Sequence, residues 1–207
     1  MDRTAIVLAG AAIALTLGIA ARPAQALDVA KTVEGCAACH GKDGSSTEPD
    51  VPTIAGQSIE YLVVNLGAYR DQQRPCPEAK FRSGPHKGDK TDMCQVLKGM
   101  SDGDLRQLAQ TYAGKTFTRF PQSFDADLAK KGKEVHDKNC EKCHSDGGSQ
   151  SADDSGILAG QRMQYLSQSM DEFRAGKRKP PQKMKPRIDK LDDDQVRALV
   201  NYYGSFK

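Results

Sequence analysis

A five-residue pattern, Cys-X-X-Cys-His, occurs twice in this chain and restricts what it can fold around. Two cysteines one helical turn apart can each form a thioether with a haem vinyl group, and the next histidine can bind the iron. The two runs use four of the six cysteines and two of the four histidines. The pattern predicts two covalently bound haem c groups, attached through Cys36 and Cys39 and through Cys140 and Cys143, with His40 and His144 as iron ligands.

The two runs lie within an internal repeat. An offset of 104 residues aligns both haem motifs and the Ala-Gly-Gln segments that end at Gln57 and Gln161. Beyond Arg74 the offset falls to 91, so the first copy carries a 13-residue insertion before Met93. Self-similarity over this length indicates a duplicated domain. We expect a signal peptide at 1–26, one domain at 27–116 and a second at 117–207.

The sequence predicts an all-α fold, in which each of two tandem cytochrome c domains wraps around one covalently attached haem. Helical spacing of apolar residues and capping boxes predict helices at 28–39, 58–70, 125–143 and 162–174, and after Ser101 and Asp192. No segment has the alternation typical of a strand. Aromatic residues make up 6% of the chain and tryptophan is absent, so the haem should supply much of each small core.

The N-terminus is typical of a secretory signal. Arg3 precedes an apolar run at 5–20, and Ala24-Gln25-Ala26 offers a small-residue cleavage site. We expect export to the periplasm, where haem attachment also takes place, and no membrane-spanning segment after cleavage; an uncleaved anchor is the alternative. The formal net charge of +3 is too small to indicate nucleic-acid binding.

The repeat predicts that Met93 and Met184 are the second iron ligands, because these two methionines align with each other. The segment 179–184 contains two prolines and should cross the haem as a loop. A thioether ligand stabilises ferrous iron. His86 and His136 are competing ligands, and we expect both at the surface instead.

Cys76 and Cys94 remain after haem attachment, and Cys76 lies in the insertion. In an oxidising compartment we expect a disulfide between them. The alternative is that Cys94 is a thiolate haem ligand or a reactive thiol, which requires an electropositive pocket.

The chain resembles the dihaem cytochrome c4 group in its Ala-Gly-Gln segments, its methionine-to-helix spacing and the Ser101-Asp-Gly-Asp104 helix start. The stretches 117–148 and 157–184 are more specifically similar to the cytochrome subunit of flavocytochrome c sulfide dehydrogenase. The resemblance covers essentially the whole mature chain and departs at the insertion. It implies that the carbonyls of Pro52 and Gly156 accept hydrogen bonds from the haem histidines. Candidate partners of the haem propionates are Tyr61, Arg70, Arg74, Tyr165, Arg174 and Arg178.

The resemblance also implies a periplasmic carrier of single electrons, and an electron-transfer subunit rather than a catalyst alone. Its partners would be a sulfide-oxidising flavoprotein subunit, a terminal oxidase or a small carrier. The chain has no Gly-rich turn for flavin. The alternatives are a dihaem redox enzyme, such as a peroxidase or a thiosulfate-oxidising cytochrome, and a structural zinc module.

A cluster of cations surrounds Met184 and predicts docking of an acidic redox partner on the second domain. This basic cluster consists of Lys177, Arg178, Lys179, Lys183, Lys185, Arg187 and Lys190.

Overall fold

The structure is a computed structural model that describes residue 1 and residues 27–207. Residues 2–26, and with them the expected signal peptide, lie outside the described residues. In the described part of the chain, no helix combines the length and the apolar character needed to cross a membrane.

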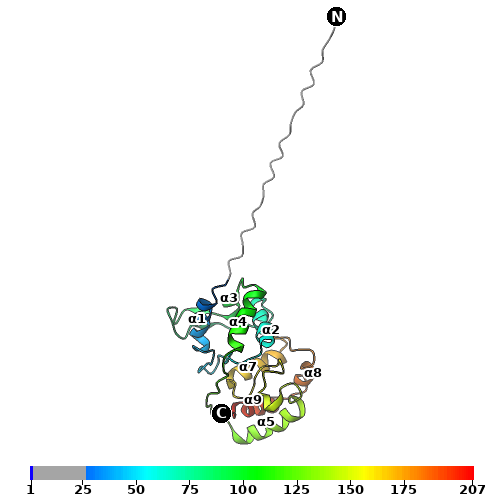
Figure 1. The fold of residues 1–207 in the computed structure, drawn as a ribbon. Coiled ribbons are helices and arrows are strands. Elements are labelled where there is room, and N and C mark those ends of the chain that lie inside the picture. The colour runs from blue at the N-terminus through cyan, green and yellow to red at the C-terminus, as the bar shows by residue number, and fades with distance from the viewer. Residues whose placement is uncertain (2–26) are drawn as a thin grey trace.

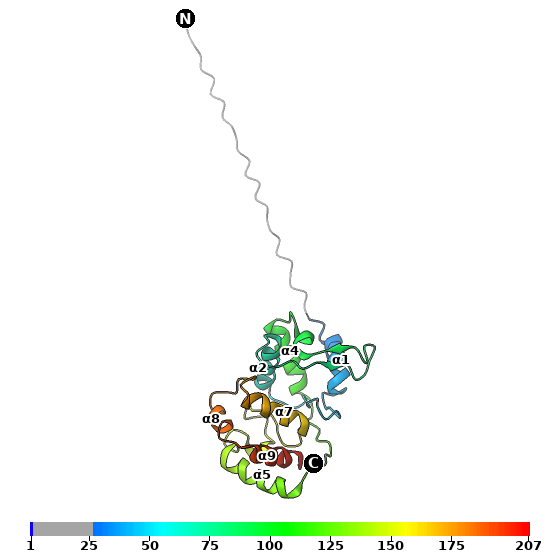
Figure 2. The same cartoon turned by 180° about the vertical axis from the view of Figure 1, so that it is seen from behind.

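Within residues 27–207, the first half forms four helices and a small hairpin, and the second half forms five helices (Figures 1 and 2). The first set is α1 (Val29–His40), α2 (Ile59–Arg70), β1 (Ala79–Lys80), β2 (Lys90–Thr91), α3 (Met93–Leu97) and α4 (Asp102–Ala113). The second set is α5 (Ala126–Asn139), α6 (Ser145–Gly148), α7 (Met163–Arg174), α8 (Lys185–Ile188) and α9 (Asp193–Gly204). The all-α prediction is confirmed, apart from the hairpin in the insertion.

Side-chain caps explain where the longer helices begin. Ser101 and Asp192 each accept a hydrogen bond from the amide three residues later, and the side chain of that later residue bonds back, so both predicted capping boxes form. Ser58 caps α2 in the same way, because its side-chain oxygen accepts a hydrogen bond from the amide of Tyr61. The predicted starts of α2, α4 and α9 are therefore confirmed.

Each half has its own core, and the last helix of each half contributes most to it. Tyr112 and Ala109 on α4 pack against Leu62 on α2 in the first half. In the second half, Leu199 and Tyr203 belong to a larger cluster on α9.

Two local expectations are wrong. The first helix of the second half was expected to reach residue 143, but α5 ends at Asn139 and Cys140 is its C-cap. The chain turns there because the Glu141 carboxylate accepts hydrogen bonds from the amides of Asp146 and Gly147. The insertion was expected to lack strands, but β1 and β2 pair antiparallel, with Ala79 opposite Thr91. Strands of two residues are too short to show alternation.

Candidate functional site

The first haem motif lies on the last turns of α1. Cys36 and Cys39 are one turn apart on this helix and half-buried, and His40 is the last helical residue, with 7% of its surface exposed. A regular helix therefore sets the cysteine spacing that two thioethers require.

The second motif has the same spacing but a different backbone. Cys140 ends α5, and the amides of Cys143 and His144 both donate to its carbonyl at 3.0 and 2.9 Å. This compact turn takes the place of a helix. Cys143 is exposed, whereas its counterpart Cys39 is half-buried.

Both histidines that are predicted to bind iron are oriented by a backbone carbonyl. The Nδ1 atom of His40 lies 2.9 Å from the Pro52 carbonyl oxygen, and that of His144 lies 3.3 Å from the Gly156 carbonyl oxygen, as expected. A bond at Nδ1 leaves Nε2 free to bind a metal. Burial lowers the pKa of both imidazoles, which favours the neutral form that binds iron. These residues fit two haem c groups.

The two nominated methionines occupy similar positions. Met93 begins α3, and Met184 directly precedes α8; both are half-buried. The amide of Met184 donates to the Pro181 carbonyl at 2.9 Å, so this methionine follows a turn rather than a regular helix, as expected.

The two halves exchange hydrogen bonds through the repeated glutamines. Gln57 accepts from the Ile157 amide at 2.8 Å. Gln161 accepts from the Thr53 amide at 2.9 Å and donates to the Thr53 carbonyl at 2.8 Å. Residues 53 and 157 are themselves equivalent in the repeat, so the contact is reciprocal. Both glutamines are 2% exposed.

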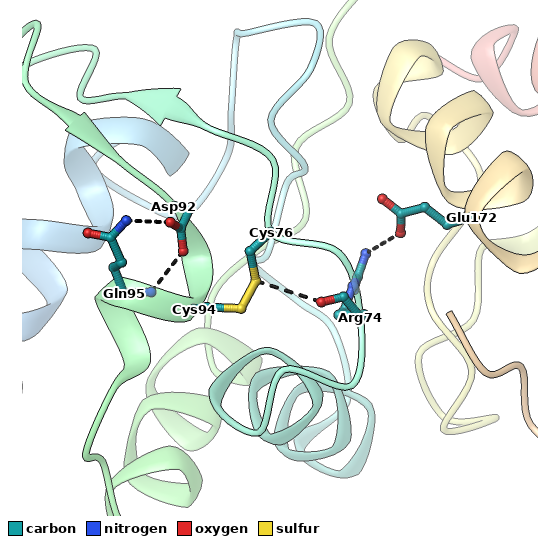
Figure 3. The surroundings of a disulfide bond; sticks show 6 residues. All are labelled: Arg74, Cys76, Asp92, Cys94, Gln95 and Glu172. Atoms are coloured by element: carbon teal, nitrogen blue, oxygen red, sulfur yellow. Dashed lines mark hydrogen bonds and ion pairs between the residues drawn. A yellow bond between two sulfur atoms is a disulfide. The ribbon is translucent and has the colours of Figure 1, made fainter. Parts of the chain in front are cut away.

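Beside this contact lies a group of cations and tyrosines, in which Arg74 is buried and Arg178, Tyr61 and Tyr165 are half-buried. The Arg178 guanidinium donates to Asn65 Oδ1 at 2.6 Å, across the two halves. Arg74, also from the first half, donates to the same Asn65 oxygen and lies 3.5 Å from the Glu172 carboxylate on α7 (Figure 3). Arg74 is 5% exposed, and its Nε has no protein partner in the described part of the chain.

The pKa values of the tyrosines in this group depend on burial and on the two arginines. Burial opposes ionisation of Tyr165, but Arg74 and Arg178 lower its pKa to about 8. Burial raises the pKa of Tyr61, which packs closely against Gly156 of the second half. The group is an electropositive cluster between the halves that suits carboxylates.

Only part of the predicted propionate set comes together. Arg70 pairs with the exposed Asp102 at 2.6 Å, and Arg174 pairs with the exposed Asp193 at 2.7 Å. Asn65 and Glu172 were missed by the sequence analysis. Their repeat counterparts are Ser169 and Ala68, so the self-alignment carries no signal for them.

His136 is buried, and the prediction that it lies at the surface is wrong. Its side chain is fully covered, with Nδ1 at 2.8 Å from the Tyr203 hydroxyl and Nε2 at 2.5 Å from Glu141. Two polar partners make the burial of this ring possible. His86 is exposed and pairs with Asp89 at 3.2 Å, as expected.

Cys76 and Cys94 form the predicted disulfide, with their Cα atoms 5.9 Å apart (Figure 3). The bond joins the start of the insertion to the second residue of α3, next to Met93. The alternative of a free Cys94 thiolate finds no support in this arrangement.

Comparisons with known proteins match both halves of the chain to haem-protein families. The family described as "Cytochrome c" matches residues 26–110, and "Cytochrome C oxidase, cbb3-type, subunit III" matches residues 127–202.

Longer matches cover most of the chain. Cytochrome c4 of Azotobacter vinelandii is 30% identical over 202 residues, which is 91% of this chain and 93% of that protein. Cytochrome c4 of Stutzerimonas stutzeri is 30% identical over 206 residues, with the same two coverages of 91% and 93%. The crystal structure of reduced recombinant cytochrome c4 from Pseudomonas stutzeri matches with a TM-score of 0.67 at 25% identity, over 88% of this chain and 100% of that one.

Proposed function

We propose that this chain, which belongs to the cytochrome c4 family of dihaem c-type cytochromes, is a free-standing periplasmic carrier with axial ligand pairs His40/Met93 and His144/Met184. Membership of the family makes it an electron-transfer protein with two covalently bound haem c groups. The observation that carries the proposal is the pair of haem motifs, each with a histidine whose Nδ1 is bonded to a carbonyl.

When bound, the haems supply one-electron chemistry, and the chain supplies attachment, orientation and electrostatics. The cysteines would hold each haem, and the Nδ1 bonds to the carbonyls of Pro52 and Gly156 leave Nε2 of each histidine available as an iron ligand. The methionine thioethers would raise the reduction potential by favouring ferrous iron. No side chain has to act as a general acid or base.

We assign the haem propionates to the group of arginines and tyrosines between the halves. Arg74 and Arg178 supply the positive charge, and Tyr61 and Tyr165 supply hydroxyl groups. The unpartnered Nε of Arg74 supports this assignment, because a buried guanidinium N–H without an acceptor is costly. The group draws on both halves, so it would join the two haem sites.

A free carrier is favoured over a subunit of a sulfide dehydrogenase. The relatives that match nearly the whole chain are named cytochrome c4. The expected signal sequence supports a periplasmic location, where a terminal oxidase or a small carrier would be the partner.

The basic cluster around Met184 is the surface we assign to this partner. Six of its seven cations are exposed, and Arg178 is instead half-buried against Asn65. Lys185 pairs with Asp189 at 2.6 Å, while Lys177, Lys179 and Lys183 have no acidic partner in the described chain. Unpaired cations attract an acidic protein over distance.

The ligand assignment is tested by two substitutions. Pyridine haemochrome analysis should give two haems per chain, and the oxidised protein should have the weak near-infrared band of methionine-bound iron. Met93→Ala and Met184→Ala should each remove about half of that band and lower the potential of one haem. Full retention of the band in both variants would contradict the assignment. Turnover of peroxide or thiosulfate at enzyme-like rates would contradict the carrier.

A further inference from the structure

The insertion of the first domain lies directly on the first haem motif. The amides of Arg82 and Ser83 both donate to the Ala38 carbonyl at 3.1 Å, and the Ser83 hydroxyl lies 3.3 Å from the same oxygen. The Cys39 sulfur lies 3.9 Å from the Lys80 carbonyl. Segment 80–83 therefore packs against the second cysteine of the motif and the residue before it.

Several bonds fix this segment in place. The Cys76–Cys94 disulfide joins the start of the insertion to Cys94 on α3, just beyond its end. Lys80 belongs to β1, which pairs with β2, and Arg82 forms an ion pair with Asp50 at 2.7 Å. Because its ends and its middle are both held, the insertion forms a fixed cover rather than a free loop.

Among residues 27–207, no segment covers the second motif in this way. This motif lies in the turn that follows α5, and Lys142 and Cys143 are exposed, whereas the equivalent Ala38 and Cys39 are half-buried. A thioether places the vinyl-bearing haem edge within one bond of the cysteine sulfur. That edge must therefore lie beside segment 80–83 in the first domain and beside open surface in the second.

The hairpin and the surface around the second motif also differ in charge. In the hairpin, Lys90 pairs with Glu78 at 3.1 Å and His86 with Asp89 at 3.2 Å. Around the second motif, Lys142 has no ion pair among the described residues, and the basic cluster belongs to the same domain.

Lys80 and Lys87 of the hairpin are also exposed and without an ion pair among the described residues. The second motif and the basic cluster together have six such cations, so an acidic protein would be attracted more strongly to the second domain than to the hairpin. The six are Lys142, Lys177, Lys179, Lys183, Arg187 and Lys190.

We propose that the disulfide-held hairpin shields the cysteine edge of the first haem, so that acidic partners exchange electrons with the protein through the second haem alone. The inference rests on the proposed function, since it requires a haem on each motif. In the reduced protein, one electron would leave the second haem for the partner, and one electron from the first haem would replace it. No bond and no proton is exchanged in this step.

The test measures which haem a paramagnetic probe can approach, using the oxidised full-length protein with both haems attached. Two probes are used: hexacyanochromate(III), an anion that mimics an acidic partner, and a neutral nitroxide. The haem methyl signals of the two domains are assigned from the Met93→Ala and Met184→Ala variants. Both probes should broaden the second-haem methyls several-fold more than the first-haem methyls, with the larger contrast for the anion.

Loosening the hairpin should remove the difference seen with the neutral probe. A Cys76→Ser/Cys94→Ser/Arg82→Ala variant should at least double the nitroxide broadening of the first haem. Lys87→Ala, on the exposed hairpin loop, is the matched control and should leave it unchanged. The near-infrared band and the circular dichroism spectrum show whether each variant keeps its fold.

Equal nitroxide broadening of both haems in the native protein would overturn the cover. So would a folded triple variant in which the first haem stays as protected as before. Fewer than two haems per chain would instead overturn the proposed function, so the two failures can be told apart.

Discussion

Gln161 forms two hydrogen bonds to the Thr53 backbone and a third to the amide of Arg162. Gln161→Ala should lower the free energy of unfolding by about 3 kcal/mol, because buried backbone groups lose their partners. Gln57→Ala removes a single such bond and should cost about 1–2 kcal/mol. Denaturant unfolding of the haem-loaded protein measures both values. Equal losses in the two variants would contradict the unequal bonding at this contact.

The Glu141 carboxylate should make the stability of the fold depend on pH. His136 and the amides of Gly147 and Asp146 lower the pKa of the Glu141 carboxyl below its ordinary value of 4.5. A carboxyl whose pKa is lower in the folded state stabilises the fold fully above the ordinary pKa and loses that effect as the pH falls through the lowered value. The melting temperature of Glu141→Gln should therefore lie below that of the native protein at pH 6.

The difference in melting temperature should shrink as the pH falls below about 4.5. Circular dichroism melts across this range provide the measurement. Glu134→Gln, on the exposed side of α5, controls for the loss of one carboxylate. A difference that stays constant down to pH 2 would contradict the role given to the Glu141 carboxylate.

At the scale of elements, α5 and α9 approach so closely that only glycine fits at Gly132. An added Cβ there would overlap the Ala198 carbonyl and the Tyr202 side chain. Gly132→Ala should destabilise the second domain by about 3 kcal/mol, since the colliding atoms include helix backbone. Gly35→Ala is the matched control, because nothing lies within 4 Å of its added Cβ. It should stabilise α1 by about 0.5–1 kcal/mol.

Thermal unfolding of the two variants distinguishes these effects. A Gly132→Ala protein as stable as the native one would contradict the close helix contact. The sequence does not predict this contact, because Gly132 aligns with Asp28 in the repeat and the glycine is therefore not repeated.

Helices were predictable where local chemistry decides them, as at the capping boxes of Ser101 and Asp192. The end of α5 was not, because a carboxylate at Glu141 reaches forward to amides five and six residues away. The haem cysteines and histidines are a prediction from spacing alone. The cover over Ala38 could not be predicted, because it depends on backbone bonds that any residue could make.

At the scale of the whole molecule, we expect charge to govern the encounter with partners. Lys183→Glu/Lys185→Glu should slow electron exchange with an acidic redox protein several-fold at low salt and flatten its dependence on ionic strength. Stopped-flow spectroscopy at several salt concentrations measures this rate. Lys31→Glu/Lys98→Glu changes the net charge equally in the first domain and should have little effect. Electron-exchange rates that change neither with salt concentration nor with charge reversal at Lys183 and Lys185 would refute the assigned docking surface.

The reciprocal contact of Gln57 and Gln161 has a further consequence for how such a chain could arise. When residue 57 of one half binds residue 157 of the other, and residue 161 binds residue 53, the arrangement is that of a two-fold symmetric pair. A face of this kind is complementary to itself. An ancestral single unit carrying the same glutamine would have bound a second copy across it, and fusion of the two genes would have made that association permanent.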